Sequence, residues 1–218
     1  MTVEQTIEQL SLFSTNKESS QPKRPIENDE TIDSISGLLY VENYITEVQH
    51  DWLLEQIDKQ PWRDDLKRKV QHYGFKYDYK ARKVNLDMRI GELPEWLKRL
   101  SHNLGEDGYM QEMADQVIVN EYEPGQGITR HIDCEPCFKN TIASLSLGSG
   151  CVMDFTNKHD TQKKIPMWLA PRSLIVLRSE ARYEWFHGIA PRKSDEWNGH
   201  KYERQRRVSL TFRKVIID

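Results

Sequence analysis

Residues 207–213, near the end of the chain, read Arg-Val-Ser-Leu-Thr-Phe-Arg, a regular alternation of polar and apolar side chains. This period of two predicts a β-strand with Arg207, Ser209, Thr211 and Arg213 on one face. Two arginines on the inner face of a β-structure are costly unless anions pair with them. Because guanidinium groups bind carboxylates bidentately, the strand favours a small dicarboxylate ligand. The alternative is an edge strand with a solvated polar face.

Upstream of this strand, the sequence has many short β-like segments separated by turns that contain glycine. We expect strands at 116–122, 141–147, 151–155, 164–169, 173–177, 185–189 and 207–217. Many short strands with such turns predict a sandwich or a barrel.

The N-terminal half predicts a strand at residues 38–44 and two helices. Thr46 would cap the first helix, with Gln49 as its capping-box partner. Val48, Trp52 and Ile57 would form the buried stripe of this helix. The second helix would run from residue 94 to about 104, with proline in its first turn. The predicted fold class is therefore α+β, with helices first and a compact all-β half after them.

Composition divides the chain of 218 residues into three parts. Residues 1–36 are polar, with seven acidic against three basic side chains, and predict a disordered tail. We expect residues 37–110 to form an N-terminal extension and residues 111–218 to form the β-rich core. No apolar run approaches the roughly 20 residues of a membrane span, so we expect no membrane association.

The sequence has three cysteines, Cys134, Cys137 and Cys151. They are too few for a disulfide scaffold, so a reducing cytoplasm is the expected compartment. We interpret Cys134 and Cys137 as two ordinary thiols in a loop, and a redox pair is the alternative.

A candidate metal site begins with His131 and Asp133, which would project to the same side of an extended segment. His187, on another predicted strand, would complete two histidines and one carboxylate, the set that leaves open positions on Fe(II). A surface histidine beside a turn is the alternative for this spacing. Asn120 and Tyr122, two residues apart, would add hydrogen bonds to the ligand of the arginines.

In the order of its motifs, the sequence resembles the AlkB family of Fe(II)/2-oxoglutarate-dependent dioxygenases, which act on alkylated nucleic acids. The motifs are Asn-Glu-Tyr-Glu-Pro-Gly at 120–125, His-Ile-Asp at 131–133, Ser-Leu-Ser-Leu-Gly at 144–148, Pro-Arg-Ser-Leu at 171–174, His-Gly-Ile at 187–189 and the strand at 207–213. The resemblance covers about residues 37–218. It implies a double-stranded β-helix (jelly-roll) core and the cofactors Fe(II), 2-oxoglutarate and O2.

The resemblance also implies roles for individual residues. His131, Asp133 and His187 would bind the iron. Asn120 and Arg213 would bind the keto-acid end of 2-oxoglutarate, and Tyr122 and Arg207 its other carboxylate. Ser209, which stands where many members carry asparagine, would complete this site.

Residues 62–83, here called the lid, interleave aromatic and basic side chains. Tyr73, Phe75, Tyr77 and Tyr79 would share one face of a strand, and residues 59–83 carry nine basic against three acidic side chains. Rings that stack on bases and cations that follow phosphates suit nucleic acid, whereas packing on the core is the alternative. The family comparison favours substrate contact by Arg68, Tyr73, Phe75 and Tyr77 with a flipped-out base, and by Glu135 with the target base.

The tail contains Gln9-Leu10-Ser11-Leu12-Phe13, which resembles the pentapeptide that docks bacterial proteins on the DNA polymerase sliding clamp. Leu10, Leu12 and Phe13 would fill an apolar groove, and Gln9 would hydrogen-bond at its rim. A linker after the pentapeptide would serve as a tether. A short amphipathic helix packed on the domain is the alternative.

These observations predict a cytoplasmic, monomeric enzyme that oxidatively dealkylates N-alkylated bases in DNA. The first alternative is an oxygenase that hydroxylates or demethylates a modified tRNA nucleoside. A third hypothesis, from another class, is a non-catalytic clamp-docked module that binds DNA or RNA.

Overall fold

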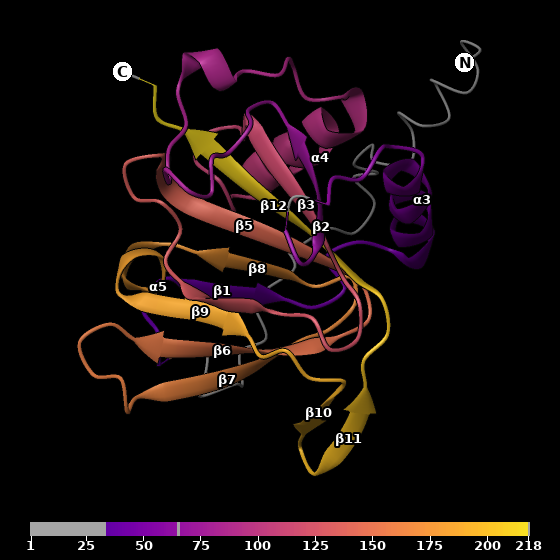
Figure 1. Ribbon diagram of the computed structural model, residues 1–218, viewed down its shortest axis with the longest axis vertical. Helices are drawn as coiled ribbons and strands as arrows, with labels where there is room; N and C mark the ends of the chain where they lie inside the picture. The colour runs from indigo at the N-terminus through magenta and orange to yellow at the C-terminus, as the bar shows by residue number, and fades with distance from the viewer. Residues whose placement is uncertain (1–33, 65, 218) are drawn as a thin grey trace.

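The computed structural model describes residues 34–64 and 66–217, which form two stacked antiparallel sheets (Figure 1). The larger sheet has the strand order β1-β8-β5-β12-β3-β2. Its strands are β1 (Leu38–Val41), β2 (Lys69–Tyr73), β3 (Gln116–Tyr122), β5 (Phe138–Gly148), β8 (Leu174–Leu177) and β12 (Arg207–Val215).

The smaller sheet has the order β4-β9-β6-β7, and a separate ribbon pairs β10 with β11. These strands are β4 (Ile128–His131), β6 (Cys151–Asn157), β7 (Lys164–Leu169), β9 (Trp185–Ile189), β10 (Ser194–Trp197) and β11 (His200–Glu203). The predicted jelly-roll core, preceded by helices, is thereby confirmed.

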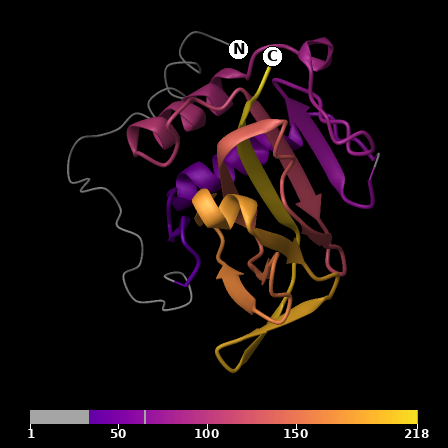
Figure 2. The same ribbon diagram turned by 90° about the vertical axis from the view of Figure 1, so that its left-hand side faces the viewer.

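The helices are α3 (Glu47–Asp58), α4 (Glu95–Glu106), α5 (Ser179–Tyr183) and the 3-10 helix η1 (Leu86–Met88). Figure 2 shows α3 (indigo) and α4 (magenta) together on one side of β12 (yellow). Their buried leucines pack in one cluster with Val208, Leu210 and Phe212 of β12. The predicted alternation of β12 is therefore confirmed, because its apolar face lies under the helices.

The capping box at the start of α3 forms as predicted, with Thr46 and Gln49 bonding each other's backbone. The predicted stripe is wrong at Val48, which is 65% exposed, while Leu53 and Ile57 are buried. At about 100° per residue, Val48 and Ile57 lie on opposite sides of the helix. The helix therefore packs through the side that carries Leu53 and Ile57.

Within the described residues, none of the helices has the length and apolar character that crossing a membrane requires.

Gly74 ends β2 with φ +77°, a left-handed conformation that favours glycine. A Cβ added here would lie 1.8 Å from the Asp115 carbonyl oxygen. We therefore expect Gly74→Ala to lower the free energy of unfolding by more than about 2 kcal/mol. Gly199→Ala is the matched control, because Gly199 has φ +76° but nothing within 4 Å of the added Cβ. Equal losses in chemical denaturation would contradict a steric role for Gly74.

Candidate metal and co-substrate site

His187 meets His131 and Asp133, which precede it by more than fifty residues, where β4 pairs with β9. His131 is directly opposite His187 in the β4–β9 pairing, and Asp133 follows two residues later. The candidate ligand atoms of these three residues all lie within 4.8 Å of one another. The imidazole rings are 4.5 Å apart between centroids, and His187 Nε2 lies 3.7 Å from Asp133 Oδ2. The predicted convergence on one point is therefore present.

The donor set fits a ferrous ion, since two imidazoles and one carboxylate are the set that non-haem iron oxygenases use. His131 Nδ1 lies 2.9 Å from the Thr129 carbonyl oxygen, which can only accept a hydrogen bond. Nδ1 therefore donates to this oxygen, which leaves Nε2 as the ring nitrogen available to a metal. His187 Nδ1 is buried without a hydrogen-bond partner among the described residues.

The protonation states also suit a metal. Burial alone would raise the pKa of Asp133, but the Arg213 guanidinium and the two histidines hold it below its ordinary value. Burial, with the neighbouring His131, lowers the pKa of His187 to about 3. At neutral pH the carboxylate is charged and the His187 imidazole is neutral, as metal ligation requires.

The polar face of β12 forms the other half of the site. Arg207 pairs in register with Tyr122, and Ser209 with Asn120, so the expected co-substrate residues adjoin across β12 and β3. Arg207 Nη2 donates to Ser146 Oγ at 3.0 Å, and the guanidinium carbon of Arg207 lies over the Tyr122 ring.

Two buried guanidinium groups therefore face this region. Arg207 is 4% exposed and Arg213 is 8% exposed. Arg213 Nη2 lies 2.7 Å from Asp133 Oδ1, while the Nε atoms of both arginines have no hydrogen-bond partner among the described residues. A single carboxylate cannot neutralise two buried cations, so this face requires a further anion.

A cavity of about 600 Å³ connects the two halves. It is lined by all of the expected metal and co-substrate residues: His131, Asp133, His187, Asn120, Tyr122, Arg207, Ser209 and Arg213. One cavity therefore holds a metal-type donor set and two guanidinium groups of the kind that bind carboxylates.

The lid residues that line the cavity are only partly those that the sequence predicts. Arg68 and Tyr77 line it, but Tyr73 packs against Trp96 and Phe75 is buried in the core. The predicted continuous strand from 73 to 79 is wrong, because the left-handed turn at Gly74 ends β2 and breaks the alternation.

Four further lid residues line the cavity and are not among the predicted substrate contacts: Leu66, Lys67, Tyr79 and Arg82. The Tyr79 hydroxyl is buried without a hydrogen-bond partner among the described residues. Lys67, Tyr79 and Arg82 belong to the same interleaved pattern of aromatic and basic side chains that marks the lid in the sequence. The turn between Asp78 and Lys83 determines where Tyr79 and Arg82 lie.

Glu135 lies outside this cavity lining. Its side chain is 50% exposed, and its Oε1 is 3.9 Å from Lys158 Nζ. Contact of Glu135 with a target base remains a prediction. The pentapeptide Gln9, Leu10, Ser11, Leu12 and Phe13 lies outside the described residues.

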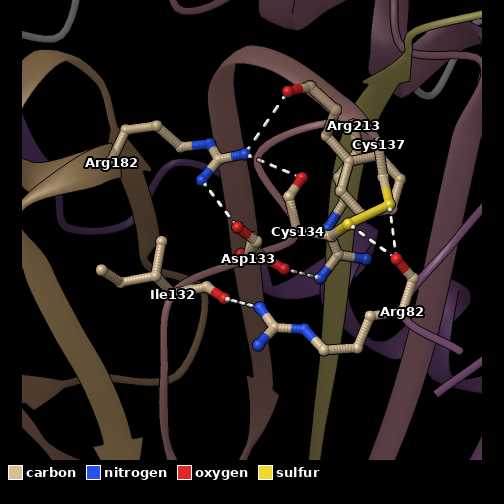
Figure 3. Close-up of a disulfide and its surroundings, with 8 residues drawn as sticks. Arg82, Ile132, Asp133, Cys134, Cys137, Arg182 and Arg213 are labelled. Atoms are coloured by element: carbon tan, nitrogen blue, oxygen red, sulfur yellow. Dashed lines mark hydrogen bonds and ion pairs between the residues drawn. A yellow bond between two sulfur atoms is a disulfide. The ribbon is translucent and has the colours of Figure 1, made fainter. Parts of the chain in front are cut away.

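Cys134 and Cys137 form a disulfide immediately after Asp133 (Figure 3). The expectation of two free thiols is therefore wrong for this structure, because the turn at 134–137 brings their Cα atoms to 5.2 Å. Cys151 is free and buried.

Comparison with known proteins agrees with this geometry. A family model described as the 2OG-Fe(II) oxygenase superfamily matches residues 37–213. A solved structure titled "The structure of OsALKBH1" superposes with a TM-score of 0.60 at 17% identity, covering 88% of this chain and 97% of that one. At this identity the superposition supports the fold alone.

Two curated relatives are closer in sequence. The mouse tRNA (carboxymethyluridine(34)-5-O)-methyltransferase ALKBH8 is 37% identical over 203 residues, covering 82% of this chain. The Arabidopsis thaliana alkylated DNA repair protein ALKBH8 homolog is 34% identical over 204 residues, covering 84% of this chain. The chain spans 30% of the mouse protein and 59% of the Arabidopsis protein.

Proposed function

The chain belongs to the 2OG-Fe(II) oxygenase superfamily, within which it is an AlkB-family 2-oxoglutarate-dependent dioxygenase, and from this premise we propose that it oxidatively dealkylates N-alkylated bases in DNA. The family uses Fe(II), 2-oxoglutarate and O2, and the His-Asp-His cluster fits the metal. With the family established and the donor set complete, the non-catalytic hypothesis has no remaining support.

The observation that carries the proposal is the charge of the cavity wall. Among the lining residues, Asp133 is the one acid, against five cations. When Arg207 and Arg213 bind the co-substrate, the cations of the lid side remain: Lys67, Arg68 and Arg82. With the rings of Tyr77 and Tyr79 beside them, they suit a flipped nucleobase on a phosphate backbone.

The residues divide the chemical work. His131, Asp133 and His187 would hold Fe(II), and Arg207 and Arg213 would orient the carboxylates of 2-oxoglutarate. When bound, Fe(II) and 2-oxoglutarate supply oxidation of a substrate C–H bond by O2, with succinate and CO2 as co-products. An N-hydroxymethyl product then loses formaldehyde and leaves the unmodified base.

A modified tRNA nucleoside is the second candidate substrate. The name of the mouse relative, a tRNA methyltransferase, favours a tRNA substrate. The name of the Arabidopsis relative, an alkylated DNA repair protein homolog, and the pentapeptide at residues 9–13 favour DNA. Because the mouse protein is far longer than the matched region, its named methyltransferase activity is not carried to this chain.

Mass spectrometry of nucleosides tests the substrate. Methylated single-stranded DNA and total tRNA are incubated separately with the protein, Fe(II) and 2-oxoglutarate, and succinate is measured in parallel. We expect the alkylated DNA base to lose one methylene mass. Gain of one oxygen mass on a tRNA nucleoside, with DNA unchanged, would replace DNA by tRNA. Succinate formation without change in either nucleic acid would contradict both substrates.

Deletion of residues 1–13 tests the clamp peptide that we propose as a tether. We expect the shortened protein to keep its activity on short oligonucleotides and to lose binding to the purified sliding clamp. Double replacement Leu12→Ala/Phe13→Ala should give the same loss, with Ser14→Ala as the matched control. Clamp binding that survives both changes would contradict the proposal.

A further inference from the structure

The lid side of the cavity is rich in hydrogen-bond donors. Arg68, Tyr77, Tyr79 and Arg82 line it with guanidinium and hydroxyl groups. Arg68 Nε donates to Asn120 Oδ1 at 2.9 Å. Because a guanidinium group has five N–H groups, this one bond leaves donors for a substrate. A base that enters this space therefore meets N–H and O–H groups.

The Tyr79 hydroxyl is one of these donors. It is buried and has no hydrogen-bond partner among the described residues. Burial raises the pKa of this hydroxyl, so it keeps its proton at neutral pH and can donate. The Arg68 guanidinium carbon lies 5.8 Å from the centre of the Tyr79 ring, which places two donor side chains next to each other. A buried polar atom without a partner is costly, and a ligand with an acceptor at this point would remove that cost.

Strong acceptors are scarce in the same lining. Among the described lining residues, Asp133 and Asn120 are the side chains with carboxylate or amide oxygens. Asp133 Oδ1 is paired with Arg213 at 2.7 Å, and Asn120 Oδ1 already accepts the bond given above. The Ile132 carbonyl oxygen accepts from Arg82 Nη2 at 3.3 Å (Figure 3). These acceptors are therefore occupied by the protein's own donors.

The charge of the lining adds to this imbalance. Five cations and one acid line the cavity, and that acid belongs to the metal site. Glu135, the acidic residue predicted at the target base, lies outside the lining, with its Oε1 3.9 Å from Lys158 Nζ. A cationic base would therefore enter a cationic space with no carboxylate left to pair with it, which weakens binding.

Alkylated bases differ in what they offer to such a lining. N1-methyladenine and N3-methylcytosine carry a positive charge at neutral pH, and each has an amino group that donates a hydrogen bond. N3-methylthymine is neutral, and its alkylated nitrogen lies between two carbonyl groups that only accept. The donors of the lid side match the carbonyl groups and have no match on an amino group.

We propose that the site prefers neutral bases whose alkylated nitrogen lies between two carbonyl groups, the thymine and uracil type, over cationic alkylated adenine and cytosine. The proposal rests on the proposed function and names the class of base within it. Tyr79, Arg68 and Arg82 supply the donors for the two carbonyl oxygens.

The reaction on this base follows the established co-substrates. One atom of O2 ends in succinate and the other in the methyl group, while the methyl group and 2-oxoglutarate each give two electrons to O2. The bond from N3 to the hydroxymethyl carbon then breaks, formaldehyde leaves and the hydroxyl proton passes to N3. The product is unmodified thymine.

Three matched substrates test the preference. Single-stranded oligonucleotides of one sequence carry N3-methylthymine, N3-methylcytosine or N1-methyladenine at the same position, and mass spectrometry follows the loss of the methyl group. We expect kcat/KM for N3-methylthymine to exceed both other values by at least about tenfold, because the cationic bases leave donors unpaired and meet like charges. Fluorescence anisotropy with Fe(II) and 2-oxoglutarate under nitrogen should show the same order of affinity without turnover.

Two tyrosine variants test the donor directly. Tyr79→Phe should lower kcat/KM for N3-methylthymine by about three- to tenfold, as loss of one hydrogen bond predicts. Since the hydroxyl has no partner within the described chain, a purely structural role predicts no loss. Tyr202→Phe is the matched control, because Tyr202 is 41% exposed on β11 and does not line the cavity. Equal activity of the Tyr79 variant and the natural chain would contradict its role as a donor.

A charge reversal on the lid tests the electrostatic part. Arg82→Glu should lower the ratio of kcat/KM for N3-methylthymine to that for N3-methylcytosine by about tenfold, and a ratio is insensitive to a general loss of activity. Lys83→Glu makes the same change of charge on the same turn but outside the lining, so its ratio should stay within about twofold of the natural value. An unchanged ratio in the Arg82 variant would contradict the electrostatic preference.

The substrate series separates this proposal from the proposed function. Equal kcat/KM values and equal affinities for the three bases, or a preference for a cationic base, would overturn the preference and leave dealkylation of DNA standing. Tighter binding of the N3-methylthymine oligonucleotide with no methyl lost from any of the three would instead overturn the proposed function.

Discussion

His131→Ala is expected to abolish Fe(II) binding and to lower 2-oxoglutarate turnover by more than about 100-fold. Removal of a residue that only supports a metal ligand costs ~10- to 100-fold in metal affinity or activity. The loss here should be larger, because His131 is itself a proposed iron ligand. His131 lies opposite His187 in the β4–β9 pairing, so its removal leaves one imidazole and one carboxylate. Anaerobic titration with Fe(II) by calorimetry, together with succinate formation, measures both losses.

His159→Ala is the matched control for this experiment. Its Nε2 pairs with Glu184 Oε2 at 2.6 Å, and its side chain is 73% exposed, away from the cavity lining. Metal affinity and turnover should be unchanged in this variant. Normal iron binding by the His131 variant would show that the His-Asp-His cluster is not the metal site.

Arg213→Ala is expected to raise the KM for 2-oxoglutarate by about 10- to 100-fold at saturating Fe(II). A charge-assisted hydrogen bond contributes about 1.5–3 kcal/mol to binding. Because Arg213 is buried, water cannot readily take the place of its guanidinium group beside the carboxylate. Arg213→Lys should restore little of this loss, since an ammonium lacks the planar fork that binds a carboxylate bidentately. Succinate formation against 2-oxoglutarate concentration gives the two parameters separately.

Lys214→Ala controls for loss of a cation on the same strand. Lys214 follows Arg213 on β12, but its Nζ pairs with Asp115 Oδ2 at 2.8 Å and does not line the cavity. The KM for 2-oxoglutarate should stay within about twofold of the natural value in this variant, as for surface substitutions generally. An equal rise in both variants would assign the effect to net charge rather than to the Arg213 contact.

Local patterns determined much of the fold. The alternation in residues 207–213 correctly placed Arg207 and Arg213 on the face opposite to Val208, Leu210 and Phe212. The capping box at Thr46 correctly gave the start of α3. Such features depend on the period of a strand or on backbone groups three residues apart, so the sequence alone is sufficient.

In the lid, the alternation of aromatic residues did not predict which rings reach the cavity. Four alternating rings predicted one strand face, yet the close approach of Gly74 to Asp115 turns the chain and buries Phe75. Which rings reach the cavity depends on a contact between segments about forty residues apart in sequence. A period in the sequence carries no information about that contact.

The sequence by itself predicted which side chains would carry the chemistry: two histidines, one aspartate and two arginines in a family-like order. Only the tertiary structure decided that they share one cavity, that Arg213 pairs with Asp133, and that Cys134 and Cys137 are bonded beneath Arg82. The reason is physical: residue type and spacing fix what a side chain can bind and which way a strand presents it. Distances between strands are set by packing of the whole domain.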